Sequence, residues 1–160
     1  MSATPVFAPL PHIAAETPAD AADVEALVLD AFGPGRFAKT AERLREGASV
    51  AAGFVAREGD VAVGSVRLWT ISVGGAPALF LGPIAVAAVH RRAGLGAELV
   101  QACLAWAEAR GQGVLLVGDA PYFGRFGFEA APDARLPGPV DPRRVLWRGA
   151  GPVSGDVRAV

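Results

Sequence analysis

The residues best suited to chemistry stand together in one short stretch, Arg91-Arg92-Ala93-Gly94-Leu95-Gly96-Ala97. It follows an apolar segment that predicts a strand and precedes an amphipathic segment that predicts a helix. A helix start offers unpaired backbone N–H groups and the positive end of the helix dipole, and glycines let an anion approach the backbone. With two guanidinium groups beside them, these features predict a site for phosphate or pyrophosphate. The alternative is that the two glycines only permit a tight turn and close helix packing.

Two common nucleotide signatures do not fit this stretch. The third glycine of G-x-G-x-x-G would fall at position 99, which is Leu99, and no G-K-[ST] follows a glycine-rich loop. Dinucleotide sites and Walker-type nucleotide sites are therefore disfavoured.

The hexapeptide RRAGLG resembles the central motif [Q/R]-x-x-G-x-[G/A] of the GNAT superfamily of N-acetyltransferases. The similarity covers residues 79–128, including VLLVGDAPYFGRFGF, and TPADAADVEALVLDAFG resembles the family's first helix. The resemblance implies that acetyl-CoA lies between two splayed parallel strands, with its pyrophosphate on the amides of residues 92–97 and its pantetheine along residues 84–86. The residues assigned to the cofactor are Ile84, Ala85, Val86, Arg91, Arg92, Ala93, Gly94, Leu95, Gly96, Ala97 and Phe123.

Acetyl transfer to an amine requires a deprotonated nucleophile, an oxyanion donor and a proton for the departing thiolate. The resemblance assigns the oxyanion donor to a backbone amide of residues 84–86. Many family members place a tyrosine four residues before the glycine of a Gly-Phe pair, but that position is Phe123 here. The adjacent Tyr122, the only tyrosine in the chain, is the candidate acid, and packing against the cofactor is its alternative role.

A second candidate catalytic residue, Asp119, follows the apolar strand VLLVG, at the end of the sheet where α/β sites gather. Its carboxylate could hold a cationic amine or, through a water, accept the amine's proton. The alternative is that Asp119 caps the next helical turn. Arg67 and Trp69 share a face of an upstream strand and either line an acceptor pocket or decorate a sheet edge.

The elements that must position these residues follow from periodicity and turn signals. Helices are predicted in residues 17–33, 37–47 and 94–110, and antiparallel strands at 50–57, 61–73 and 76–87, the last interrupted near Pro83. The order of strand, helix and strand from Leu81 to Gly118 predicts a right-handed crossover and a parallel pair. HIAAE and RVLWRG are further strand candidates, and the extreme C-terminus should fray. We expect an α/β (α+β) fold with a mixed sheet of about six to seven strands, splayed between two parallel strands, and helices on both faces.

Composition narrows the class of protein. Fifteen Lys+Arg balance sixteen Asp+Glu, for a net charge of −1, so no overall field favours nucleic acid or an anionic membrane. One cysteine and two separated histidines predict neither a disulfide nor a metal site. We expect a cytoplasmic protein with one acetyltransferase-like domain over residues 1–160, of which residues 1–11 form an irregular tail.

The leading functional hypothesis is an acetyl-CoA-dependent N-acyltransferase that acts on a primary amine of a small molecule or peptide, by direct attack when both substrates are bound. One alternative is a non-catalytic acyl-CoA-binding module that lacks the acid at Phe123. Another is a structural protein that dimerises through its apolar strands without a cofactor. A homodimer is compatible with each of these.

Overall fold

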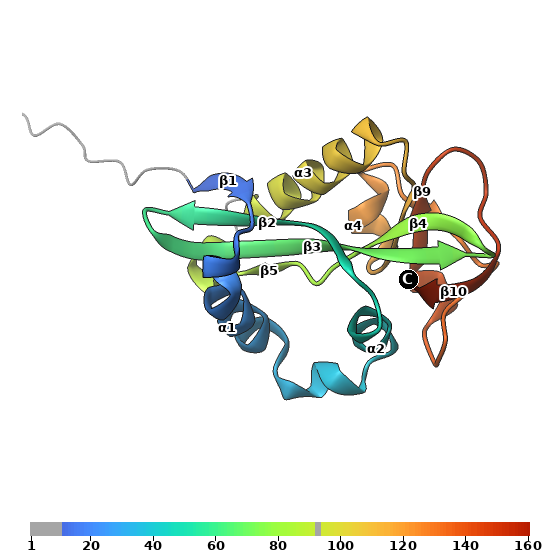
Figure 1. Ribbon diagram of the computed structural model, residues 1–160, viewed down its shortest axis with the longest axis horizontal. Helices are drawn as coiled ribbons and strands as arrows, with labels where there is room; N and C mark the ends of the chain where they lie inside the picture. Colours follow the sequence, from blue (N-terminus) through green and yellow to red (C-terminus); the bar gives the residue numbers. More distant parts are fainter. Residues whose placement is uncertain (1–10, 92–93) are drawn as a thin grey trace, which may run out of the picture.

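A computed structural model describes residues 11–91 and 94–160 of the chain (Figure 1). Residues 1–10 of the predicted tail, together with Arg92 and Ala93, lie outside the described residues. The described helices are α1 (Ala21–Phe32), α2 (Thr40–Glu46), α3 (Leu95–Ala109) and α4 (Ala120–Gly124). The described strands are β1 (His12–Ala15), β2 (Val50–Glu58), β3 (Val61–Val73), β4 (Ala76–Leu81), β5 (Ala85–Val86), β6 (Val114–Val117), β7 (Glu129–Ala130), β8 (Ala134–Arg135), β9 (Val145–Arg148) and β10 (Gly155–Ala159).

The strands form one mixed sheet around the long strand β3. Seven of them follow the order β1-β2-β3-β4-β6-β9-β7, while β5 and β10 also pair with β3 and β8 pairs with β10. The pairs β4–β6 and β8–β10 are parallel, and the other pairs are antiparallel. The connection from β4 to β6 runs through α3, so the predicted parallel pair joined by a crossover helix is confirmed.

Helices cover both faces of the sheet, as predicted: α3 and α4 lie on one side and α1 and α2 on the other (Figure 1). Because side chains alternate along a strand, Val66 and Leu68 of β3 pack under α3, while Ile71 and Val73 pack with Leu44 of α2. Burial of these two apolar layers orients α2, α3 and α4, and α1 packs through Val24 and Val28 against Val55 and Ala85. Among the described residues, no helix combines the length and the apolar character needed to cross a membrane.

The break predicted near Pro83 divides the third strand of the meander into β4 and β5. Strand β4 pairs with one end of β3 and β5 with the other, through Ser65↔Ala85 and Gly64↔Val86. Since proline has no N–H for a sheet ladder, Pro83 stands where pairing is interrupted. This interruption positions the candidate site.

Two expectations from the sequence need correction. The sheet contains more strands than the six or seven expected, because the two-residue strands β7 and β8 are too short to produce a periodic pattern. The C-terminus was expected to fray, and this is wrong: β10 pairs with β3 and buries Val157. A single buried apolar residue gives β10 a weak local signal, and its partner lies more than eighty residues earlier in the chain.

Candidate active site

The sheet opens between β4 and β6. Their parallel pairing is limited to Leu79↔Val114 and Phe80↔Leu115, after which the chain beyond β4 turns away to pair as β5 with β3. Strand β6 continues to Val117, paired only with β9 on its other side. The predicted splay between two parallel strands is therefore present, with β5 on one side of the opening and the end of β6 on the other.

The edge of β5 that faces away from β3 presents backbone groups without a neighbouring strand. The Ala87 N–H donates to the Val63 carbonyl at 2.8 Å, so residue 87 is directed toward β3. Because backbone groups alternate along a strand, the N–H and C=O of Val86 point the other way. The guanidinium Nε of Arg91 donates to the Val86 carbonyl at 3.1 Å, which agrees with this direction. The N–H of Val86 is thus available to a ligand in the opening.

Helix α3 begins beside this edge. Its N-cap, Gly94, has a left-handed backbone with φ of 75°, which disfavours residues that carry a Cβ. The amides of Leu95, Gly96 and Ala97 belong to the first helical turn, whose N–H groups have no partner within the helix. The Leu95 side chain is buried in the core, so this residue offers a ligand only its backbone.

Gly96 is not required by protein packing in the described structure. A Cβ built there would meet the Tyr122 hydroxyl oxygen at 3.7 Å and a Val86 methyl at 4.0 Å, which are ordinary contacts. The backbone of Gly96 is helical, and glycine costs a helix up to about 1 kcal/mol relative to alanine. The close-packing alternative therefore does not explain Gly96, whereas the turn at Gly94 does need a glycine.

The arginines next to the turn are only partly described. Arg91 lies between β5 and α1, with its terminal nitrogen 3.9 Å from an Asp30 carboxylate oxygen in addition to its bond to Val86. It would have to leave these partners to neutralise a phosphate. Arg92 and Ala93 were also assigned to the pyrophosphate, and they lie outside the described residues.

Helix α4 carries the candidate catalytic side chains. An Asp119 oxygen accepts a hydrogen bond from the Tyr122 backbone N–H at 3.0 Å, so Asp119 caps α4, the structural alternative raised from the sequence. The Tyr122 ring packs edge-on against Phe123, and its hydroxyl lies next to the start of α3. Phe123 is buried against the end of β6, where a Cβ at Gly118 would lie 2.5 Å from its ring.

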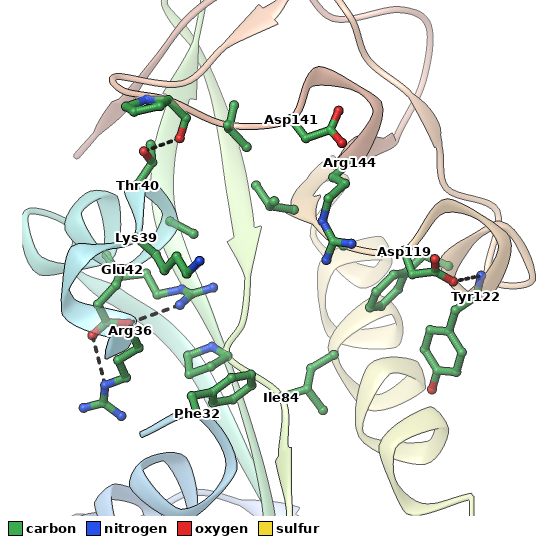
Figure 2. Close-up of a pocket in the computed structure, with 18 residues that line it drawn as sticks. Phe32, Arg36, Lys39, Thr40, Glu42, Ile84, Asp119, Tyr122, Asp141 and Arg144 are labelled. Atoms are coloured by element: carbon green, nitrogen blue, oxygen red, sulfur yellow. Dashed lines mark hydrogen bonds and ion pairs between the residues drawn. The ribbon is translucent and has the colours of Figure 1, made fainter. Parts of the chain in front are cut away.

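A cavity of about 750 Å³ occupies the opening and extends toward α2. Four of the residues predicted for the site line it, namely Ile84, Asp119, Tyr122 and Phe123, so the structure brings the catalytic candidates together with the strand edge (Figure 2). Ala85 turns its side chain to the opposite face, where it packs with Val24 and Val28 of α1, and can contribute only backbone.

Two walls of this cavity were missed in the sequence. One comes from the end of α1 through α2, and the other from residues 139–144; the lining residues they contribute are Phe32, Arg36, Lys39, Thr40, Ala41, Glu42, Arg45, Pro139, Val140, Asp141 and Arg144. Thr40 fastens the two walls together, because its hydroxyl donates to the Pro139 carbonyl at 2.6 Å. The only local signal was the mixture of aromatic and cationic residues in FGPGRFAKT, between the two predicted helices.

Two buried arginines make the first of these walls, residues 32–45 and here called the α2 wall, electropositive. One Glu42 oxygen lies 3.2 Å from a terminal nitrogen of Arg45, and the other lies 3.9 Å from the Nε of Arg36. The two arginine side chains are only 12–13% exposed, and Arg36 also reaches the exposed Glu25 at 3.2 Å. Burial lowers the pKa of the Arg45 guanidinium from its ordinary value, and the charge of Glu42 opposes this shift. Arginine nevertheless remains protonated in proteins, so the one carboxylate of this wall is shared by two cations.

Other side chains considered from the sequence have structural roles. Arg67 pairs with Glu16 through two hydrogen bonds of 3.0 and 3.1 Å, and the Trp69 indole donates to the Gly82 carbonyl at 2.6 Å. Neither residue lines the cavity. The one cysteine, Cys103, is fully buried on α3, and burial raises the pKa of its thiol to about 12, which suits a packed residue rather than a nucleophile.

Comparison with known families agrees with this geometry. The family model described as the acetyltransferase (GNAT) family matches residues 21–128, which run from the start of α1 to just beyond α4. Comparison with curated proteins finds no match.

Solved structures of similar proteins include ligand complexes. The chain is 28% identical to the GNAT family N-acetyltransferase YhbS from Escherichia coli, solved with CoA, with a TM-score of 0.82 and coverage of 100% of this chain and 94% of that one. A GNAT family acetyltransferase from Brucella melitensis, solved with acetyl-CoA, is 26% identical, with a TM-score of 0.72 and coverage of 94% and 96%. Naa50 from Arabidopsis thaliana, at 16% identity, a TM-score of 0.61 and coverage of 88% and 99%, shares the fold.

Proposed function

This chain belongs to the GNAT acetyltransferase family, and on that premise we propose that it transfers the acetyl group of acetyl-CoA to a primary amine of a small molecule or peptide. The observation that carries the proposal is the opening of the sheet between β5 and β6, which meets the start of α3 on one side and the cavity on the other. The two similar proteins solved with CoA and acetyl-CoA support the choice of donor.

The residues of the opening fit an extended acyl-CoA. The amides of Gly94 to Ala97 and the dipole of α3 suit the pyrophosphate, and the space left by the missing side chain of Gly96 lets a ligand approach the helix. The outward N–H of Val86 suits an amide-containing chain that runs along β5. Arg92 and Ala93 complete the proposed phosphate turn in sequence.

The donor supplies an activated thioester carbonyl. The amine nitrogen forms the new C–N bond, the C–S bond breaks with its electron pair on sulfur, and the proton lost from nitrogen is balanced by the proton that sulfur gains. A backbone N–H on the exposed edge of residues 84–86 stabilises the oxyanion, a contribution of about 3 kcal/mol in other acyl-transfer enzymes. We assign protonation of the thiolate to Tyr122 and attraction of the cationic amine to Asp119, both of which line the cavity.

One observation favours a second candidate function, a non-catalytic acyl-CoA-binding module. The position at which many family members carry a tyrosine is Phe123, and its buried ring has no proton to give. Tyr122 then becomes the group on which the catalytic proposal depends.

The two candidates separate in one experiment. Binding of CoA is measured by calorimetry, and thiol release from acetyl-CoA is followed with a panel of primary amines. The acetyltransferase proposal predicts CoA binding together with amine-dependent thiol release and a product heavier by one acetyl group in mass spectrometry. Tight CoA binding without release for any amine would favour the binding module, and no CoA binding would contradict both.

A further inference from the structure

The cavity carries more positive charge than its own lining neutralises. Its α2 wall presents three cations, Arg36, Lys39 and Arg45, with Glu42 as the only carboxylate of that wall. The Nε atoms of both arginines are buried without a hydrogen-bond partner among the described residues. A buried charged group with unmet hydrogen-bonding capacity is costly, so an anion bound at this wall would be favourable.

Lys39 and Arg144 add charge from opposite sides. Figure 2 shows both side chains directed into the cavity, Lys39 from the start of α2 and Arg144 from the segment before β9. Among the described residues, neither side chain takes part in an ion pair. Both are exposed, so they can move toward a ligand.

The other two carboxylates of the lining, Asp141 and Asp119, already accept hydrogen bonds. Asp141 accepts hydrogen bonds from the backbone N–H and the guanidinium of Arg143, at 3.0 to 3.1 Å. Asp119 caps α4 at the far end of the cavity from α2 (Figure 2). The hydrogen bonds from Arg143 lower the pKa of the Asp141 carboxyl, and Arg144 is near enough for its charge to contribute. Among the described residues, however, Asp141 forms an ion pair with neither Arg144 nor Lys39.

Resting on the proposed function, we propose that the acceptor is a primary amine that also carries a carboxylate, which binds between Lys39 and Arg144 at the electropositive α2 wall. The amine of such an acceptor lies toward Ile84 and the edge of β5, and the carboxylate lies away from the reacting atoms. A guanidinium and an ammonium group both form strong charge-assisted hydrogen bonds to carboxylate oxygens.

The rest of the cavity lining indicates what kind of side chain or spacer the acceptor carries. Phe32, Ile84, Val117, Phe123 and Val140 give the lining an apolar character. A volume of about 750 Å³ falls in the usual range for small-molecule sites, and the acyl end of the donor occupies part of it. The acceptor is therefore a small amino acid with an apolar side chain or spacer.

The test uses pairs of amines that differ only in the carboxylate: L-phenylalanine and phenethylamine, L-leucine and 3-methylbutylamine, β-alanine and ethylamine. Thiol release from acetyl-CoA gives kcat and KM for each amine. We expect the carboxylated member of at least one pair to have a kcat/KM about tenfold or more above its partner, since one charge-assisted contact supplies such a factor. Equal values, or a preference for the plain amine, in every pair would overturn the proposal.

Four variants connect this preference to the cavity. Lys39→Met and Arg144→Met remove the two converging charges, and Arg43→Met and Arg158→Met are the matched controls because they remove equal charges from exposed side chains outside the lining. The cavity variants should lower the carboxylate preference about tenfold through KM with kcat kept, and the controls should leave it unchanged. An equal loss in cavity and control variants would overturn the proposal by assigning the preference to overall charge.

A binding measurement separates this proposal from the proposed function. Calorimetry on the CoA-saturated protein gives affinities for the same pairs without any turnover. Carboxylate-selective binding that is lost in Lys39→Met and Arg144→Met, without thiol release, supports the anion site and contradicts acetyl transfer. Thiol release without carboxylate preference supports acetyl transfer and contradicts the anion site. Failure of every carboxylated amine to bind would also overturn the anion site.

Discussion

The two sides of the opening are built in different ways. The proposed donor side comes from one stretch of the chain, of which residues 84–91 and 94–97 are described, and it would act mainly through backbone groups at the edge of β5 and the start of α3. The acceptor side is assembled from the α1–α2 region, the end of β6 with α4, and residues 139–144, and it acts mainly through side chains. Binding on the donor side would depend on the conformation of the backbone, and binding on the acceptor side would depend on which residues line the cavity.

This difference teaches which part of the site can change independently. A backbone site withstands most substitutions except those that add a side chain at a glycine, because its hydrogen bonds do not depend on residue type. A side-chain site changes with every substitution of a lining residue. Under the proposed function, the fold can therefore keep its donor while the choice of acceptor changes with substitutions at Lys39, Arg45 and Arg144.

The substitution expected to have the largest effect is Gly94→Glu, on the donor side. A carboxylate would stand at the N-cap of α3, where we place a pyrophosphate, and a Cβ at Gly94 meets no atom within 4 Å, so the chain should still fold. A left-handed backbone costs a residue with a Cβ about 1–2 kcal/mol. We expect CoA affinity to fall about 1000-fold or more in calorimetry.

Gly111→Glu is the matched control for this substitution. Gly111 follows the other end of α3, has a φ of 64°, and would likewise place a Cβ with no other atom within 4 Å. The two variants share the backbone penalty and the added charge but differ in distance from the opening. Equal CoA affinities in the two variants would remove the phosphate site from the start of α3.

Tyr122→Phe should have the next largest effect. The ring contacts with Phe123 and Phe126 remain, so only the proton donor is lost. We expect kcat to fall about 100-fold, which is at the low end of what a placed general acid contributes, with the KM for acetyl-CoA unchanged. Steady-state kinetics of thiol release measure both constants.

The kinetics of Tyr122→Phe also distinguish the two roles considered for Tyr122. In that variant, a higher KM for acetyl-CoA with normal kcat would assign the ring to packing against the donor, and full turnover would remove Tyr122 from the mechanism. Phe123→Tyr, in the Tyr122→Phe background, places a hydroxyl at the position that many relatives use. Recovery of kcat would show that the site can accept the acid at either position.

Much of the fold could be predicted from the sequence, because its main signals are local. The apolar stripe of α1, the two turns that join β2, β3 and β4, and the crossover through α3 all appear in short windows of residues. The exceptions are β7, β8 and β10, whose pairing depends on distant partners. Strand β10 exists because the thirteen-residue β3 extends far enough to offer it an edge.

The proposed donor side has local signals in the sequence for the same reason, and the proposed acceptor side has almost none. The turn at residues 91–97 and the interruption at Pro83 are both visible in the sequence. Lys39 and Arg144, in contrast, are 105 positions apart in the sequence. They form one candidate site only because α2 and the segment before β9 face each other across the cavity. Asp119 shows the remaining ambiguity, since the same residue caps α4 and lines the cavity.

Gly96→Ala should have a smaller effect, raising the stability of the fold and lowering the affinity for CoA. The added methyl group makes only ordinary contacts in the protein, so the helix should gain up to about 1 kcal/mol of stability. The same methyl group narrows the approach of a ligand to α3, and we expect CoA affinity to fall about tenfold. Thermal unfolding measures the change in Tm, and calorimetry on the same preparation measures the change in CoA affinity. A higher Tm with unchanged affinity would show that CoA binding does not need the space beside Gly96.

Asp20→Asn should have the smallest effect on the site, because Asp20 lies before α1 and holds Thr17 and Arg57. The backbone N–H of Thr17 lowers the pKa of the Asp20 carboxyl below its ordinary 3.8, and the Arg57 guanidinium adds to this shift. A carboxylate with a lowered pKa stabilises the fold above its unfolded pKa and loses that contribution as the pH falls through the folded pKa. The difference in Tm between the two proteins should therefore be full at pH 7 and shrink below about pH 4, with CoA affinity at pH 7 unchanged. A difference that stays constant with pH would assign the role of Asp20 to its neutral hydrogen bonds, and a loss of CoA affinity would show that the donor side depends on more than residues 84–97.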